Sequence, residues 1–506
     1  MKSDPGTAFN FTIEFIKIII RFDWKRLLLY TLTAFTLITG ITLGGCATNP
    51  ATGEIQLQLY SEAQEIEIGK KSDEDIVGSL GLYNDKDLKK YIEKLGLELA
   101  AESERPHLPW TFRLVDDPAV NAFALPGGYI YVTRGILTYL NNEAELVGVI
   151  GHEIGHVTAK HSIQQMSNQQ LIQFGFGLGR AILPKLEGLR RLAGMGLGLM
   201  MLQFSREDEN QADELGLRYM VRTEYDPRQL ASVMTMLDGV TQAGNGGRVP
   251  VWLSTHPDPG NRRERILRRV DAMDAGSMGT TINRYEFLDQ VDGMVFGPNP
   301  REGFFKENRF YHPDLKFFFE FPRDWETSNL KQAVVGVSPD QYAVIQIMIT
   351  DKKTIKEAAD EFFGQEGLSA EQPKIGKTNG MPEISGVFTV PTQRVVLQGF
   401  AAFIAYKKNT YQILGYTTEE KWPEFEPAIT ASTRSFNRLT DKKALSVKPM
   451  RLKIVTLDKE TTLEDFADRF PSPVSIETLA LINHVGRNER LHAGMKLKLV
   501  EGEKIQ

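Results

Sequence analysis

The sequence predicts a multidomain chain: a mainly α domain with α+β character, then an α+β domain, then a small βααβ unit. At 506 residues the chain exceeds what one hydrophobic core usually organises, so we expect about two to four domains. After residue 300 the pattern changes from helical periodicity to alternating strand-like runs, and residues 297–300 have the Gly/Pro content of a linker. The predicted boundaries are 1–45 for an export leader, 46–300, 305–440 and 448–501.

The N-terminal leader has the pattern of an export signal. Lys25 and Arg26 precede an apolar run over residues 27–43, and small residues lead directly to Cys46. This pattern resembles bacterial lipoprotein signals, which implies that Cys46 is the lipidated mature N-terminus, and Ala47 behind it favours the outer membrane over the inner. An uncleaved membrane anchor is the alternative, since the apolar run is nearly long enough to span a bilayer.

Charge and cysteine content argue against two classes of function. The net charge is −6 and the chain has no lysine- or arginine-rich tract, so nucleic acid is not a predicted partner. With a single cysteine the chain forms no intrachain disulfide, and Cys46 lies far from the motif described next, which argues against a thiol protease.

The strongest chemical signal is an HExxH motif formed by His152, Glu153 and His156. Asn142 precedes the segment as a helix cap, and apolar residues follow at helical spacing, so the motif is predicted to lie on a helix. Imidazoles four residues apart project from one helical face and can meet one zinc ion. Glu153 lies beside them and can act as general base toward a water molecule, which predicts peptide-bond hydrolysis.

A catalytic zinc needs a third protein ligand. The candidate is Glu209, on a second helix predicted to begin near Ser205, with Asp213 one turn further on the same face. Asp213 can then accept the second N–H of a ligand histidine and fix its tautomer. The alternative is a solvated acidic helix start. His161 follows His152 by nine positions where the metzincin pattern has ten, so we expect it on the helix surface.

These motifs together resemble the HtpX/BepA-type zinc metallopeptidases of peptidase family forty-eight. The resemblance covers about residues 46–270, including segments 47–53 and 61–66, which are similar to the periplasmic lipoprotein branch. It implies a zincin-like domain with one Zn²⁺ per chain. By this resemblance His152, His156 and Glu209 hold the metal, while Glu153 and Asp213 serve catalysis. Gln211 stands where relatives often carry Glu, at a position not expected to touch the metal.

Two further residues are candidates for a regulatory or transition-state role. His256 lies in residues 254–257, a segment similar to a later family motif whose histidine reaches the active site in some relatives. The alternative is a simple turn before a helix predicted over residues 262–270. Arg262 matches the arginine that follows this motif in relatives, but helix capping or surface pairing explains it equally well.

Residues 121–133 predict a substrate-binding strand. Two short strands flank the turn Pro126-Gly127-Gly128, and an extended peptide can pair along such an edge through main-chain hydrogen bonds. Broad selectivity for unfolded polypeptide follows, whereas an ordinary hairpin is the alternative. The predicted strand residues are Asn121, Ala122, Phe123 and Ala124. Further on, residues 171–204 predict two helices, because charges interrupt the apolar run before it is long enough to span a membrane.

The remaining segments predict binding or scaffolding modules. Residues 321–325 resemble small PsbP-like modules, and residues 448–501 resemble a LysM module, whose family role is peptidoglycan binding. Lys459 and Glu460 stand where the LysM family usually has Gly-Asp, so a purely structural βααβ unit is an equal alternative.

The sequence therefore predicts a zinc metalloendopeptidase of the bacterial cell envelope. We expect it on the periplasmic side, lipid-anchored through Cys46, hydrolysing unfolded or misassembled envelope proteins bound in extended form. A chaperone, or an adaptor tethered to peptidoglycan, using the same cleft is the alternative. Intact catalytic motifs favour the enzyme, because a pure binder has no use for Glu153.

Overall fold

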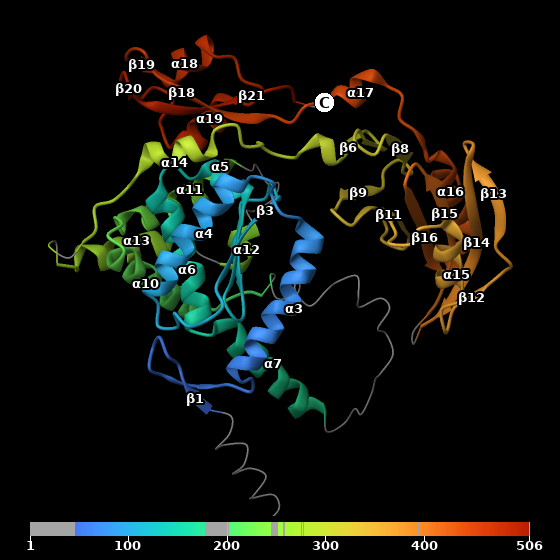
Figure 1. Cartoon of the computed structure of the whole chain (residues 1–506), viewed down its shortest axis with the longest axis horizontal. Helices are drawn as coiled ribbons and strands as arrows, with labels where there is room; N and C mark the ends of the chain where they lie inside the picture. The colour runs from blue at the N-terminus through green and yellow to red at the C-terminus, as the bar shows by residue number, and fades with distance from the viewer. Residues whose placement is uncertain are drawn as a thin grey trace, which may run out of the picture.

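The computed structural model describes residues 46–177, 200, 202–243, 251–256, 259–274, 276, 278–392 and 395–504. The predicted leader, the Cys46 side chain and the centre of the 171–204 segment lie outside the described part of the chain. Three parts are visible: a central helical domain, a sheet domain beside it, and a C-terminal unit lying over the helical domain (Figure 1). No helix in the described ranges is long and apolar enough to cross a membrane.

The helical domain is organised around α6 (Glu143–Thr158), which is buried along its whole length. Most of its residues are apolar or glycine, as expected for a helix enclosed by others. The predicted cap is confirmed, because the Asn142 side chain accepts a hydrogen bond from the Glu145 amide. The other elements are β1 (Cys46–Thr48), β2 (Ile55–Leu57), α3 (Glu62–Leu80), α4 (Lys86–Ala101), α5 (Arg134–Tyr139), α7 (His161–Gly177), α10 (Arg206–Arg222), α11 (Arg228–Ala243), α12 (Val251–Thr255), α13 (Pro259–Asp271) and α14 (Arg284–Val291).

Glycines allow α6 and α10 to approach each other closely. A Cβ atom at Gly155 would lie 3.0 Å from the Cα of Ala212, and one at Gly216 would lie 3.0 Å from the His152 amide nitrogen. Larger side chains would push the two helices apart. The contact places the face of α6 that carries the two histidines against the first turns of α10.

A small sheet lies beside this helix pair, in the order β3 (Thr111–Val115), β5 (Tyr129–Thr133), β4 (Ala122–Leu125). β3 runs parallel to β5, and β4 pairs antiparallel with β5, so β4 is an edge strand. The turn between β4 and β5 uses Gly127 at φ 78°, a conformation that side chains other than glycine rarely adopt. The structure thus contains the two strands that the sequence predicts.

The sheet domain has an eight-stranded antiparallel sheet with helices α15 (Ile355–Phe363) and α16 (Trp422–Ser435). α16 packs on one core cluster and α15 on another. The strands are β9 (Glu326–Asn329), β10 (Ala333–Val337), β11 (Val344–Ile349), β12 (Ser369–Ala370), β13 (Lys374–Thr378), β14 (Met381–Pro391), β15 (Val396–Tyr406) and β16 (Asn409–Thr418), with β6 (Phe304–Lys306), β7 (Arg309–His312), β8 (Phe317–Glu320) and β17 (Asn437–Arg438) in a smaller sheet.

The C-terminal unit has the predicted βααβ order: β18 (Arg451–Thr456), α18 (Leu463–Arg469), α19 (Ile476–Asn483) and β21 (Lys496–Glu501). β18 pairs antiparallel with β21. Its buried apolar residues belong to the same cluster as those of α6 and α11, so the unit shares one hydrophobic core with the helical domain. The likeness to LysM modules stays a prediction.

Candidate metal centre

Two helices supply the central polar residues. α6 carries His152, Glu153 and His156 on the face turned toward α10, and α10 carries Glu209 in its first turns. Ser205 caps α10 in a capping box with Asp208, which confirms the predicted start of this helix. The side chains of His152, Glu153, His156 and Glu209 are buried, each at most 1% exposed.

The side chains converge on a volume that fits a metal ion. The Nε2 atoms of His152 and His156 are 3.1 Å apart, and Glu209 Oε1 lies 3.5 Å from His156 Nε2. One ligand atom each from His152, His156, Glu209 and His256 lie within 4.8 Å of one another. Among the described residues, the buried Glu153 Oε2 accepts no hydrogen bond, and Glu209 Oε2 makes an ion-pair contact with Arg262. A set of imidazole nitrogens and a carboxylate is one that zinc prefers.

Asp213 stands behind His152. Its Oδ1 lies 3.1 Å from His152 Nδ1, so it can accept the proton on that nitrogen while Nε2 faces the centre. Burial opposes ionisation of Asp213, but Arg262 and the contact with His152 outweigh it and hold its pKa well below the usual range.

Glu153 faces the same volume with a weakly held carboxylate. Its Oε1 accepts a long hydrogen bond, 3.4 Å, from the indole N–H of Trp252. Burial raises the pKa of Glu153 to about 7, and the nearby charge of His256 only partly opposes this. A carboxyl group with a pKa in this range can both take up and release a proton near neutral pH.

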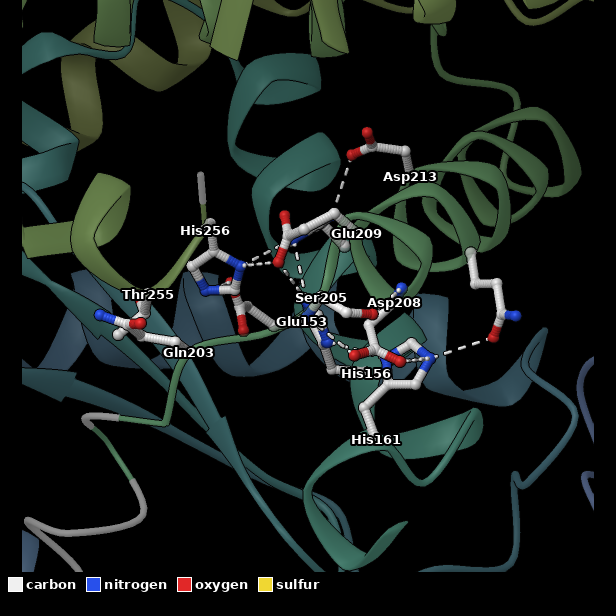
Figure 2. Close-up of polar contacts among 12 residues, drawn as sticks. Glu153, His156, His161, Gln203, Ser205, Asp208, Glu209, Asp213, Thr255 and His256 are labelled. Atoms are coloured by element: carbon white, nitrogen blue, oxygen red, sulfur yellow. Dashed lines mark hydrogen bonds and ion pairs between the residues drawn. The ribbon is translucent and has the colours of Figure 1, made fainter. Parts of the chain in front are cut away.

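His256 enters the centre from α12. Its Nδ1 lies 2.7 Å from Glu209 Oε1 and 3.3 Å from His152 Nε2, and Figure 2 shows its ring turned toward Glu209. Trp252 stacks on the His256 ring at 4.6 Å, and Phe204 stacks on His156 at 4.0 Å. The α12 segment therefore covers the centre. Sequence reasoning missed Trp252 and Phe204, although both lie within five residues of a motif.

One prediction about a surface position is wrong, and one surface alternative is excluded. His161 is only 2% exposed, and its Nδ1 lies 2.9 Å from His156 Nδ1, so it is not a helix-surface residue. Arg262 is fully buried and does not form a surface pair. Its guanidinium donates to Asp213 Oδ1 at 2.6 Å and makes ion-pair contact with Glu209 Oε2 at 2.7 Å.

The four predicted strand residues lie next to the centre. Ala122, Phe123 and Ala124 belong to the edge strand β4, and Asn121 precedes it. All four are buried, and Asn121 Oδ1 has no hydrogen-bond partner. The Trp252 amide makes a 3.4 Å hydrogen bond to the carbonyl of Val120, which attaches α12 at the start of this strand.

Comparison with known proteins decides the family. Residues 86–270, the stretch that contains both metal-facing helices, match the model of Peptidase family M48. The chain carries a metallopeptidase domain of this family. That result confirms the family resemblance stated from the motifs, whereas the likeness to the periplasmic lipoprotein branch stays a prediction. The family's usual metal is zinc.

Curated relatives match just under half of the chain. The chain is 30% identical over 254 residues to the beta-barrel assembly-enhancing protease of Escherichia coli (strain K12), covering 47% of this chain and 52% of the relative. It is 30% identical over 246 residues to the mitochondrial metalloendopeptidase OMA1 of Arabidopsis thaliana, covering 47% and 46%. The chain thus spans about half the length of the curated relatives it matches.

Among solved structures, the cyanobacterial PsbP of Synechocystis sp. PCC 6803 aligns with 26% of this chain and 91% of its own length. The sequence identity is 15% and the TM-score 0.22. A likeness at this level does not decide the fold of residues 305–440, so the PsbP-like assignment stays a prediction.

Proposed function

We propose that this M48 metallopeptidase is a zinc-dependent endopeptidase of the bacterial cell envelope that hydrolyses unfolded or misassembled envelope proteins. The observation that carries the proposal is the buried group of His152, His156 and Glu209 with Glu153 beside it. The similarity to the beta-barrel assembly-enhancing protease of Escherichia coli supports a role in protein assembly or quality control.

Each residue has a proposed task. His152, His156 and Glu209 hold one Zn²⁺, which when bound supplies Lewis acidity toward a water molecule and a carbonyl oxygen. Glu153 takes the proton of the attacking water and passes it to the leaving nitrogen. Asp213 holds His152 in the tautomer that leaves Nε2 free, and Arg262 keeps Asp213 ionised. No covalent intermediate with the protein is needed.

The edge strand β4 is proposed to bind substrate. It pairs with β5 on one side only, and its outer edge lies next to the segment that brings in Trp252 and His256. An extended peptide that adds to this edge would place a main-chain carbonyl near Glu153, using hydrogen bonds that do not depend on side-chain identity. Unfolded polypeptide suits such a site better than one fixed sequence.

His256 is proposed as a latch. Within the described ranges, its contact with Glu209 and the cover formed by α12 close off Glu153, whose side chain is fully buried. Cleavage then requires α12 to move away. The proposed location is the periplasmic side of the envelope, anchored to the outer membrane through lipidated Cys46, with peptidoglycan as a further partner of the βααβ unit.

Proteolysis of casein by the purified full chain in detergent tests the proposal, with zinc content measured for wild type, Glu153→Gln and His256→Ala. We expect wild type to cleave, Glu153→Gln to retain zinc without cleaving, and His256→Ala to cleave faster. If all three bind zinc and none cleaves any unfolded reporter, the chaperone or adaptor function takes precedence. Equal rates in Glu153→Gln and wild type would remove Glu153 as the base.

A further inference from the structure

A second imidazole lies behind His156, on the side away from the metal centre. His161 Nδ1 is 2.9 Å from His156 Nδ1, and Figure 2 shows the two rings next to each other with Asp208 alongside. His161 is buried at the start of α7, and a hydrogen bond between the two Nδ1 atoms requires that one of them donates and the other accepts. A neutral imidazole has one N–H donor and one acceptor nitrogen.

Metal binding fixes the direction of every hydrogen bond in this contact. With the lone pair of His156 Nε2 toward the metal, its Nδ1 carries the proton and must donate. His161 Nδ1 is then the acceptor, and His161 Nε2 carries the proton. That nitrogen lies 3.1 Å from Gln211 Oε1 and 3.7 Å from Asp208 Oδ1. Two oxygen acceptors, Gln211 Oε1 and Asp208 Oδ1, therefore lie on the side of His161 Nε2, the nitrogen that must donate.

The chain of hydrogen bonds continues to the N-terminal hairpin. Gln211 Nε2 donates to Glu54 Oε2 at 3.4 Å, just before β2. This contact orients the Gln211 amide with its oxygen toward His161 rather than its nitrogen. The four residues His156, His161, Gln211 and Glu54 thus form one series with a single consistent donor direction.

We propose that His161 and Gln211 are positioning residues that set zinc affinity by fixing the orientation and tautomer of His156. The inference rests on the proposed zinc-holding role of His156. The two metal-facing histidines are supported unequally: a carboxylate, Asp213, contacts His152, whereas a neutral imidazole followed by a neutral amide supports His156. Support of a ligand histidine by outer residues typically changes metal affinity about 10- to 100-fold.

The unequal support predicts opposite effects of two substitutions. His161→Phe keeps a planar ring in the space but removes the acceptor, so zinc affinity should fall about 10- to 100-fold. Gln211→Glu turns the last acceptor into a carboxylate, which strengthens the series, so zinc affinity should rise about three- to tenfold. His161→Gln, which retains an acceptor oxygen, should fall between wild type and His161→Phe.

Zinc affinity of the full chain is measured by competition with a chromophoric chelator, with circular dichroism of the metal-free form as the folding check. Asn168→Asp, on the exposed face of α7, is the control for an added negative charge and should match wild type. The inference is overturned if folded His161→Phe binds zinc like wild type, or if Gln211→Glu binds it no more tightly. If wild type itself binds no zinc, the proposed function fails instead. Should His161→Phe not fold, the Gln211→Glu result alone decides.

Discussion

Replacing Lys498 by methionine tests how the C-terminal unit is fastened to the peptidase domain. Lys498 lies on β21 and is fully buried. Its ammonium donates to the carbonyls of Thr138 at 2.8 Å and Ile482 at 2.9 Å, and also to that of Leu140. Thr138 and Leu140 lie just before the cap of α6, so one side chain joins the βααβ unit to the start of the catalytic helix.

The expected loss of stability follows from the fate of these three carbonyls. Three hydrogen bonds from a charged donor contribute about 5–9 kcal/mol in gross terms, but burying the ammonium costs several kcal/mol and offsets most of this. Methionine removes both contributions and leaves two carbonyls without their donor, since Ile482 O still accepts from Asn141 Nδ2. At about 1–3 kcal/mol for each of the two unsatisfied carbonyls, we expect Lys498→Met to lower the free energy of unfolding by about 2–6 kcal/mol.

Urea unfolding followed by tryptophan fluorescence measures the change. Lys453→Met is the matched control: it lies in the paired strand β18, with its side chain 54% exposed and bound only to Glu501. The control should shift the free energy of unfolding by no more than about 0.5 kcal/mol. A Lys498→Met chain as stable as wild type would refute the reasoning. The free-energy cost of burying the ammonium would then equal the stabilisation that its hydrogen bonds supply.

Two further predictions concern the centre and the sheet domain. Trp252→Leu removes the indole that stacks on His256 and lies 4.7 Å from the Arg262 guanidinium, so the closed arrangement should lose about 1–2 kcal/mol of stability. Casein cleavage should then rise about 5- to 30-fold with zinc retained. Slower cleavage at full zinc content would instead make Trp252 part of the productive site. Burial lowers the pKa of His312 to about 4, below its unfolded value near 6.5, so its stabilising effect is complete above pH 6.5 and is lost as pH falls toward 4. The free energy of unfolding, measured by thermal unfolding at pH 7 and pH 5, should differ between the two pH values by about 1–2 kcal/mol less in His312→Asn than in wild type. Equal differences in the two chains would contradict the assignment.

Local patterns predicted the helices that carry the centre, because their signals lie within a few residues. Asn142 and Ser205 cap α6 and α10, and the spacing of His152 and His156 fixes their common face once the helix exists. The group of His152, His156 and Glu209 then required only that the two helices meet. Their contact depends on small residues at matching positions, Gly155 and Gly216, whose role appears only in three dimensions.

The wrong prediction lies where the chain changes direction, and one alternative stayed open where tertiary contacts distinguish among similar residues. His161 was placed on a continuing helix, but α6 ends at Thr158 and Lys160 adopts φ 58°, which turns the chain so that His161 folds back onto His156. Arg262 is one of five arginines in α13, and only the position of Asp213 on another helix distinguishes it from the others. Likewise, no local signal indicates that Lys498, 360 positions from Thr138, binds its carbonyl.

The candidate ligand residues His152, His156 and Glu209 lie on α6 and α10, whereas the α12 segment covers the centre. α6 and α10 touch backbone to backbone along their glycines, so neither can move without breaking the domain core. α12 has only five residues, and its main-chain attachments include one hydrogen bond from Trp252 to Val120 and one from Phe204 to Thr255. The proposed opening for substrate therefore involves α12 rather than α6 and α10. Substitutions in α12 should then change the rate of cleavage at constant zinc affinity, whereas substitutions at His161 and Gln211 should change zinc affinity first.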